Sequence, residues 1–140
     1  MGTLQMTTEI KTQNQPEFLY GDLSFKIIGI LIEIHKELGP YAREKQYCDL
    51  FAEKLKEQSI AYKRELTIGD SGNIVDFIVD SKIVLEFKAV PFLADKHYDQ
   101  VKRYLYQTNL KLGILINFRD VRLHPKRVLN INNIHKSAVL

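Results

Sequence analysis

Apolar residues along the chain follow two spacings, one typical of helices and one of strands. Three segments repeat apolar residues three or four positions apart, as one face of a helix does. They predict helices over residues 22–38, 42–58 and 94–108. Shorter runs rich in β-branched and aromatic residues predict strands. These lie at residues 61–68, 73–79, 83–89 and 112–117, with a short edge strand expected at 121–123.

Turn residues separate these segments and set their ends. The pair Gly39 and Pro40 is expected to stop the first helix, and Asp22 or Ser24 to cap its start. The segment 69–72, Gly-Asp-Ser-Gly, is a predicted turn. In the first strand, alternation places Tyr62, Leu66 and Ile68 on one side.

The order of elements predicts the fold class. Two helices, three strands, a helix and a strand are typical of a mixed α/β sheet with helices on its faces. The strands at 73–79 and 83–89 are apolar on both faces, as central strands are. We expect a flexible leader at 1–21, one domain at 22–125 and a loosely ordered tail at 126–140.

Composition fits a soluble domain and excludes some classes of protein. The chain has 140 residues, of which 45% are hydrophobic and 26% charged. No apolar run approaches the roughly 18 residues that span a bilayer, so no membrane partner is expected. The single cysteine, Cys48, excludes an internal disulfide and a cysteine-rich zinc site. We expect an intracellular, cytoplasmic protein, and the net charge of +3 permits a polyanionic partner without requiring one.

Three charged residues interrupt the two central strands. If residues 80–82 form the loop, Val79 pairs with Ile83 and Asp76 lies opposite Glu86. Residues two apart in a strand share a face, so Lys88 points the same way as Glu86. Two carboxylates and an ammonium group would then cluster on one sheet face.

This cluster suits a hard divalent ion. Carboxylate oxygens favour Mg²⁺ or Mn²⁺, which can polarise a phosphoryl oxygen and activate a bound water. Lys88 could stabilise negative charge in the transition state. The spacing alone equally allows a cross-strand ion pair with no ligand, because acid-x-Lys is common in strands.

Several stretches, in order, resemble the GxxExxY proteins, a small family in the PD-(D/E)XK nuclease superfamily. The similarity runs from about residue 23 to 118. The matching stretches are Leu38-Gly39-Pro40, Glu44 to Tyr47, Val75-Asp76-Phe77, Val84 to Val90, Gln100 with Tyr104, and Leu112 to Phe118. The resemblance implies a restriction-endonuclease-like, three-layer α/β/α sandwich with a central mixed sheet.

The resemblance also assigns residue roles. Glu44 would join Asp76 and Glu86 as a metal ligand, and a carboxylate at a helix start is also favoured by the helix dipole alone. Tyr47, one turn later, is expected to pack. One departure is Tyr41, which stands where the family name calls for glycine.

Gln100 and Tyr104 lie one helical turn apart and are similar to the Q-x-x-x-Y element of RecB-type nucleases, which act on DNA ends. The resemblance places this pair at the active site, near substrate or Lys88. The alternative is that Tyr104 belongs to the core and Gln100 to the solvated surface. His97 precedes Gln100 by three residues and could border the site.

The sequence therefore predicts a metal-dependent nuclease that acts on nucleic acid, and DNA is expected as the substrate before RNA. Its catalytic set is Asp76, Glu86, Lys88, Gln100 and Tyr104; its Mg²⁺ or Mn²⁺ ligands are Glu44, Asp76 and Glu86. Two other classes stay open: a nuclease fold that binds nucleic acid without cutting, and a small interaction subunit. A homodimer or a protein partner is compatible with either.

Overall fold

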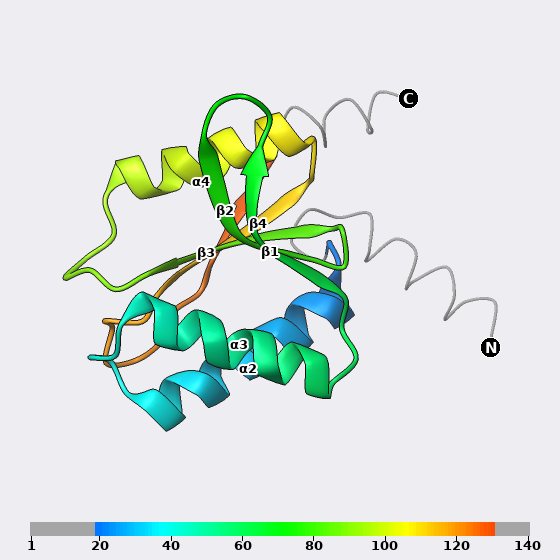
Figure 1. Cartoon of the computed structure of the whole chain (residues 1–140). Coiled ribbons are helices and arrows are strands. Elements are labelled where there is room, and N and C mark those ends of the chain that lie inside the picture. The colour runs from blue at the N-terminus through cyan, green and yellow to red at the C-terminus, as the bar shows by residue number, and fades with distance from the viewer. Residues whose placement is uncertain (1–18, 131–140) are drawn as a thin grey trace, which may run out of the picture.

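The computed structural model describes residues 19–130, which form one mixed sheet with helices on both sides (Figure 1). The elements are α2 Gly21–Leu38, α3 Glu44–Glu57, β1 Tyr62–Ile68, β2 Asn73–Val79, β3 Ile83–Lys88, α4 Asp95–Thr108, β4 Leu112–Asn117 and β5 Lys126–Leu129. The three helices and the first four strands lie within one or two residues of their predicted bounds.

The sheet has the order β1-β2-β3-β4-β5. β3 and β4 are parallel and α4 connects them, whereas the other neighbouring strands are antiparallel. Helices α2 and α3 cover one face and α4 covers the other (Figure 1). The predicted three-layer α/β/α fold with a mixed central sheet is confirmed.

A tight turn sets the register of the central hairpin. Asp80 and Ser81 both have positive φ, 52° and 55°, and Lys82 N–H donates to Val79 O. This is the pattern of a type I′ turn, whose twist matches that of paired strands. Val79 therefore pairs with Ile83, as predicted.

The first two strands twist sharply halfway along, which the alternation pattern did not predict. Tyr62 packs in the core under α2 and α3, but Leu66 and Ile68 pack against α4 on the other face. Glu65, between them, has φ of 53°, so the strand does not continue its regular alternation. The expectation that these three residues share one side was wrong.

The start of α2 is capped differently from the prediction. Neither Asp22 nor Ser24 is the N-cap; that position is Tyr20, in the left-handed region with φ of 53°. Ser24 Oγ instead donates to Tyr20 O at 2.7 Å, inside the first helical turn. The reason is that the helix begins at Gly21, one residue before the expected cap.

The edge strand lies at Lys126–Leu129, not at residues 121–123, within a segment predicted to be loosely ordered. Val121 is 85% exposed and offers the sheet no buried side chain, whereas Val128 is buried against the α4 side. Arg127 holds this strand to the start of α2 by donating to Leu19 O at 3.2 Å.

The predicted leader up to residue 18 and the tail from 131 lie outside the described residues. Between residues 19 and 130, no helix is long and apolar enough to cross a membrane.

Candidate functional site

Three acidic side chains surround the last residues of β3. Asp76 Oδ2 accepts a hydrogen bond from Phe87 N–H at 2.7 Å. Glu44 Oε1, from the start of α3, accepts one from Ala89 N–H at 3.1 Å. Glu86 lies in β3, directly before Phe87. The structure thus brings all three predicted ligands to one strand end.

Asp76 and Glu86 form a carboxyl pair in which Glu86 is buried and Asp76 is half-buried. Glu86 is only 5% exposed, and Asp76 lies close enough for its charge to shift the pKa of Glu86. Burial raises the pKa of Glu86, and the Asp76 charge raises it further. Burial likewise raises the pKa of Asp76. Without a cation, the pair therefore retains a proton that ordinary carboxyls have lost at neutral pH.

Lys88 is the cation nearest to this pair. Its Nζ lies 3.6 Å from Glu86 Oε1, and its side chain is 18% exposed. Glu86 and Lys88 project to the α4 side of the sheet, because Val84, two residues earlier, packs there. The predicted cluster of two carboxylates and an amine on one face is therefore present.

The described residues do not show the predicted convergence of three acidic side chains on one metal ion. Within residues 19–130, no three His, Cys, Asp or Glu side chains are grouped so that they could hold a metal ion. Glu44 Oε1 accepts from Ala89 N–H, two residues further along the chain than the Phe87 N–H that Asp76 accepts from. The Asp76–Glu86 pair nevertheless fits a divalent cation: in the part of the chain that the structure describes, Glu86 Oε2 is buried without a hydrogen-bond partner, and a cation would relieve the carboxyl repulsion.

Tyr47 fixes the turn that carries Glu44. Its ring is fully buried and stacks on Phe118 with centroids 4.0 Å apart. Its hydroxyl donates to Gly39 O and accepts from Ala42 N–H. Tyr47 therefore packs, as predicted, and positions the start of α3.

Tyr41, at the family glycine position, does not strain this turn. The positive φ, 73°, belongs to Gly39, and Tyr41 is not among the residues with positive φ. Its ring is 81% exposed and lies under the Arg119 guanidinium, 5.8 Å from centroid to Cζ.

Gln100 and Tyr104 are brought together, but Tyr104 belongs to the core. Gln100 Nε2 donates to the Tyr104 hydroxyl at 2.8 Å, and that hydroxyl donates to Ile74 O at 3.2 Å. Tyr104 is 2% exposed, and burial raises its pKa to about 12. The pair therefore anchors β2 two residues before Asp76.

Two residues that the sequence analysis did not single out complete the site. Asn117, buried at the end of β4, accepts from Val90 N–H at 3.0 Å and donates to Val90 O at 2.9 Å. Arg119 Nη2 donates to Ala89 O at 3.2 Å. An amide at the end of an otherwise apolar strand was the available signal for Asn117. For Arg119, the sequence offered no signal apart from the positive charge of the side chain.

His97 accepts a hydrogen bond from Ala94 N–H at 2.8 Å through Nδ1, so it closes the first turn of α4. Burial lowers its pKa, and the nearby Lys88 charge adds to this effect.

Cys48 is buried, and burial is the main cause that raises its pKa; the Asp76 charge raises this pKa further. An un-ionised thiol is a poor nucleophile, so the surroundings of Cys48 indicate a buried packing residue.

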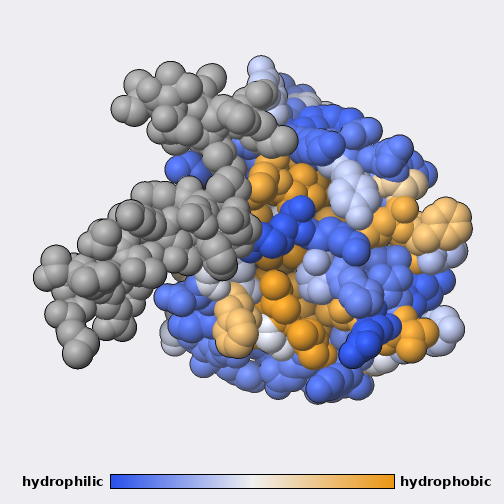
Figure 2. All heavy atoms as spheres, turned by 180° about the vertical axis from the view of Figure 1, so that it is seen from behind, coloured by the Kyte–Doolittle hydropathy of each residue, from blue (hydrophilic) through white to orange (hydrophobic). Residues whose placement is uncertain are grey.

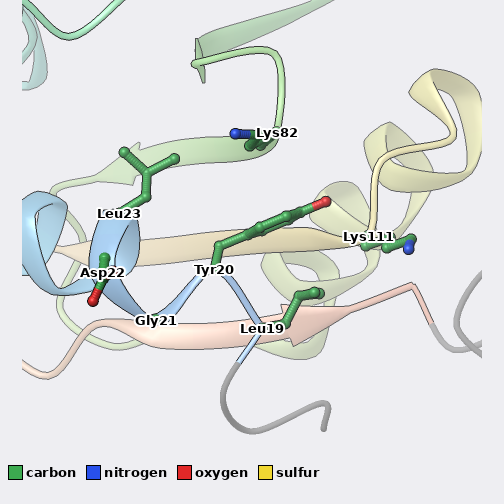
Figure 3. Close-up of a pocket in the computed structure, with 7 residues that line it drawn as sticks. All are labelled: Leu19, Tyr20, Gly21, Asp22, Leu23, Lys82 and Lys111. Atoms are coloured by element: carbon green, nitrogen blue, oxygen red, sulfur yellow. The ribbon is translucent and has the colours of Figure 1, made fainter. Parts of the chain in front are cut away.

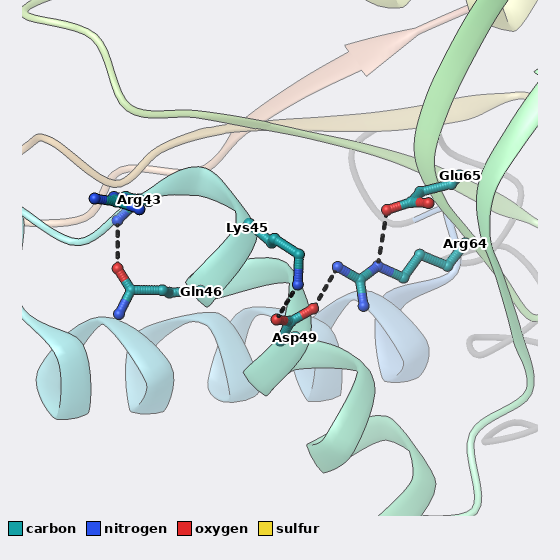
Figure 4. A network of polar contacts seen from close by, with 6 residues as sticks. All are labelled: Arg43, Lys45, Gln46, Asp49, Arg64 and Glu65. Carbon is teal, nitrogen blue, oxygen red and sulfur yellow. Dashed lines mark hydrogen bonds and ion pairs between the residues drawn. The ribbon is translucent and has the colours of Figure 1, made fainter.

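Ion pairs hold α3 beside β1 (Figure 4). Arg64 Nη2 lies 2.6 Å from Asp49 Oδ1, and Lys45 Nζ lies 3.0 Å from Asp49 Oδ2. Arg43 N–H donates to Gln46 Oε1 at 2.9 Å and closes the first turn of α3. These contacts fix the helix end from which Glu44 projects.

A pocket of about 380 Å³ lies at the opposite end of the sheet (Figure 3). It is lined by Leu19, Tyr20, Gly21, Asp22, Leu23, Lys82 and Lys111. Lys82 precedes β3 and Lys111 precedes β4, whereas Lys88 and Asn117 end these strands. The pocket is therefore separate from the carboxyl pair.

Fold and site together define a restriction-endonuclease-like α/β domain. Residues 21–128 match the model of the PD-(D/E)XK nuclease superfamily, so the chain belongs to that superfamily. No curated protein matches the chain. The chain is similar to a solved structure described as "Crystal structure of SSO0001", with a TM-score of 0.45 and 17% identity over 77% of this chain and 67% of that one.

Proposed function

We propose that this domain is a cytoplasmic, metal-dependent nuclease that hydrolyses phosphodiester bonds, with DNA as its substrate. The observation that carries the proposal is the Asp76–Glu86 carboxyl pair, with Glu86 buried and Lys88 Nζ 3.6 Å from Glu86 Oε1. When both carboxyls are ionised, the single amine leaves an excess of negative charge, which is costly unless a cation binds. We extend the proposal to membership of the GxxExxY group, on the motifs around Glu44, Glu86 and Gln100.

Asp76 and Glu86 would hold Mg²⁺ or Mn²⁺, whereas Glu44 accepts a hydrogen bond from Ala89 N–H at the same strand end. When bound, such an ion polarises a phosphoryl oxygen and lowers the pKa of a coordinated water. Lys88 lies beside the pair and would stabilise charge that develops on the scissile phosphate. Gln100 and Tyr104 would act as positioning residues, because they hold β2 next to Asp76.

Arg119 places a second cationic side chain, besides Lys88, near the end of β3. Its guanidinium donates to Ala89 O, and Glu44 accepts from the N–H of the same residue. Guanidinium groups suit phosphate oxygens because they offer several N–H donors. We assign Arg119 to binding of a phosphate next to the scissile one.

The test combines metal binding with cleavage. Calorimetry with Mn²⁺ should show binding to the wild type and none to Asp76→Asn. Single- and double-stranded DNA, and RNA of the same sequence, should be incubated with the wild type and with Lys88→Met. We expect cleavage of DNA by the wild type and a loss on the order of a hundredfold or more in Lys88→Met.

Lys56→Met is the matched control, since Lys56 is exposed at the far end of α3. It should cleave like the wild type. Full activity of Lys88→Met would refute the catalytic role of the lysine. Tight DNA binding without divalent ions and no cleavage with them would instead identify a non-catalytic binding module.

A further inference from the structure

Helix α2 is apolar on two sides, although only one side is buried. Its inner side packs under the sheet through Ile27, Ile30, Leu31 and Ile34. A second set, called here the outer stripe, consists of Phe25, Ile28, Gly29 and Ile32. At 100° per residue these four positions cover an arc of about 100°, which is the width of a packing face.

The outer stripe is open to solvent among the described residues. Phe25 is 80% exposed and Ile32 is 39% exposed. Figure 2 shows the side of the molecule on which α2 lies in front of α3, with apolar side chains exposed between hydrophilic ones. Contiguous exposed apolar surface of this kind marks interaction sites more often than single scattered residues do.

Gly29 has no evident purpose inside the chain. Among residues 19–130, a Cβ built at this position would meet nothing within 4 Å, so none of these residues requires the missing side chain. Glycine in a helix interior is destabilising relative to alanine. A glycine on an exposed helix face lets a second helix approach the backbone closely, so Gly29 would favour packing against another helix.

Charges at the two ends of the stripe are opposite. Asp22 lies seven residues before Gly29 and Lys36 seven residues after it, so both are two turns away on the same side of the helix. Both are exposed. Neither takes part in the ion pairs found between residues 19 and 130, which are Lys45–Asp49, Lys54–Glu33, Lys54–Glu37, Arg64–Asp49, Arg64–Glu65, Lys82–Asp80 and Lys88–Glu86.

We propose that the outer stripe docks on the same stripe of a second copy of this chain, with the two α2 helices antiparallel. A two-fold axis near Gly29 brings Asp22 of each copy to Lys36 of the other and Phe25 to Ile32. This self-complementarity of charge and size favours a second copy over an unrelated partner. A parallel pairing would place Asp22 beside Asp22 and Lys36 beside Lys36.

The pairing is independent of the proposed catalysis. Helix α2 has 18 residues and is about 27 Å long. The carboxyl pair lies near the C-terminal end of α2, because Tyr47 ties Gly39 to the turn that carries Glu44. An antiparallel pair therefore places the two sites at opposite ends of the interface, and each site is complete in one copy.

The first test is the oligomeric state of the full chain by sedimentation velocity over a range of concentrations. One helix pair buries little area compared with a standard interface, so we expect a weak, concentration-dependent dimer. Phe25→Glu should raise the dimer dissociation constant by about thirtyfold or more. Tyr106→Glu is the matched control, since Tyr106 is similarly exposed, 78%, on the opposite face of the sheet. A wild type that stays monomeric at all concentrations overturns the proposal, whatever else covers the stripe.

Charge reversal tests the antiparallel arrangement. Asp22→Lys and Lys36→Asp should each weaken the dimer, and the double variant Asp22→Lys/Lys36→Asp should restore it. A double variant as weak as the single ones would overturn the antiparallel pairing.

Gly29→Gln separates helix stability from docking. Glutamine is the better helix former, so the monomer should gain thermal stability, while the side chain keeps the second helix away and the dimer is lost. Nuclease activity per chain should be unchanged in Gly29→Gln and Phe25→Glu. A dimer that survives in Gly29→Gln would contradict the close approach of the two helices.

Discussion

At the residue scale, the carboxyl pair is a site where function opposes stability. Glu86 is buried and Asp76 half-buried beside it, and Lys88 Nζ lies 3.6 Å from Glu86 Oε1 and offsets one charge. Raised pKa values mean that folding favours the protonated form of these groups. Their contribution to stability is therefore complete below the unfolded pKa, 4.5 for glutamate, and is lost as pH rises towards the higher folded pKa.

Glu86→Gln should therefore stabilise the metal-free protein at neutral pH. Glutamine keeps the shape and removes the ionisation, so the gain over the wild type should grow from near zero at pH 4.5 to about 1–3 kcal/mol at pH 8. Urea unfolding at several pH values in the presence of a chelator measures it. Glu53→Gln, at an exposed site on α3, is the control and should show no such trend. A pH-independent difference would contradict the ionisation argument.

Tyr104 joins α4 to β2 through a single hydroxyl. Tyr104→Phe keeps the ring and removes the contacts with Gln100 and Ile74 O. We expect a loss of about 1 kcal/mol in the free energy of unfolding and a several-fold lower cleavage rate, with Mn²⁺ affinity retained. Tyr106→Phe, on the exposed side of α4, should change neither quantity. A normal cleavage rate in Tyr104→Phe would show that the hydroxyl serves only the fold.

At the scale of elements, the contact between α4 and β4 depends on one glycine. A Cβ at Gly113 would lie 2.6 Å from Val101 Cγ1 and 3.6 Å from Leu105 Cδ1. Both residues are fully buried in the α4 layer. The close approach of helix and sheet is therefore possible only without a side chain at this position.

Gly113→Ala should destabilise the domain by about 1–3 kcal/mol, because α4 must move away from the sheet. Introducing Val101→Ala as well should recover part of this loss, since the methyl group that clashes is removed. Denaturant unfolding of both single variants and the double variant gives the coupling energy. Strict additivity would indicate that the added methyl is accommodated elsewhere.

At the scale of the whole molecule, a bound ion would connect segments that are far apart in sequence. Glu44 lies 45 residues from Ala89, which it contacts at the end of β3. An ion held by Asp76 and Glu86 would stabilise the native state only, because the unfolded chain does not hold these carboxyls together. The stabilisation should depend on pH, because a proton on the pair competes with the ion.

Mn²⁺ at ten times its dissociation constant should raise the free energy of unfolding by about 1.4 kcal/mol. The dissociation constant itself should fall as pH rises from 6 to 8, since the pKa values of both carboxyls are raised. Thermal unfolding with and without Mn²⁺ at the two pH values measures this, and Asp76→Asn should show no effect of the ion. An equal shift in Asp76→Asn would place the ion elsewhere.

Much of this architecture follows from local sequence. Helical periodicity located α2, α3 and α4, and apolar runs located β1 to β4, because both signals depend on neighbours within a few residues. The register that sets Val79 against Ile83 also followed, since a short turn fixes it. From that register, the cluster of Asp76, Glu86 and Lys88 was correctly predicted.

The tertiary structure alone decided the remaining features. Leu66 lies on the α4 face because the strand twists at Glu65, and the alternation of apolar and polar residues does not predict such a twist. Asn117 clamps Val90 across 27 residues, and Glu44 is held by Ala89 N–H instead of joining the carboxyl pair. Local periodicity specifies which residues are buried, but the partners of polar side chains depend on how distant segments pack, and only the folded chain determines that.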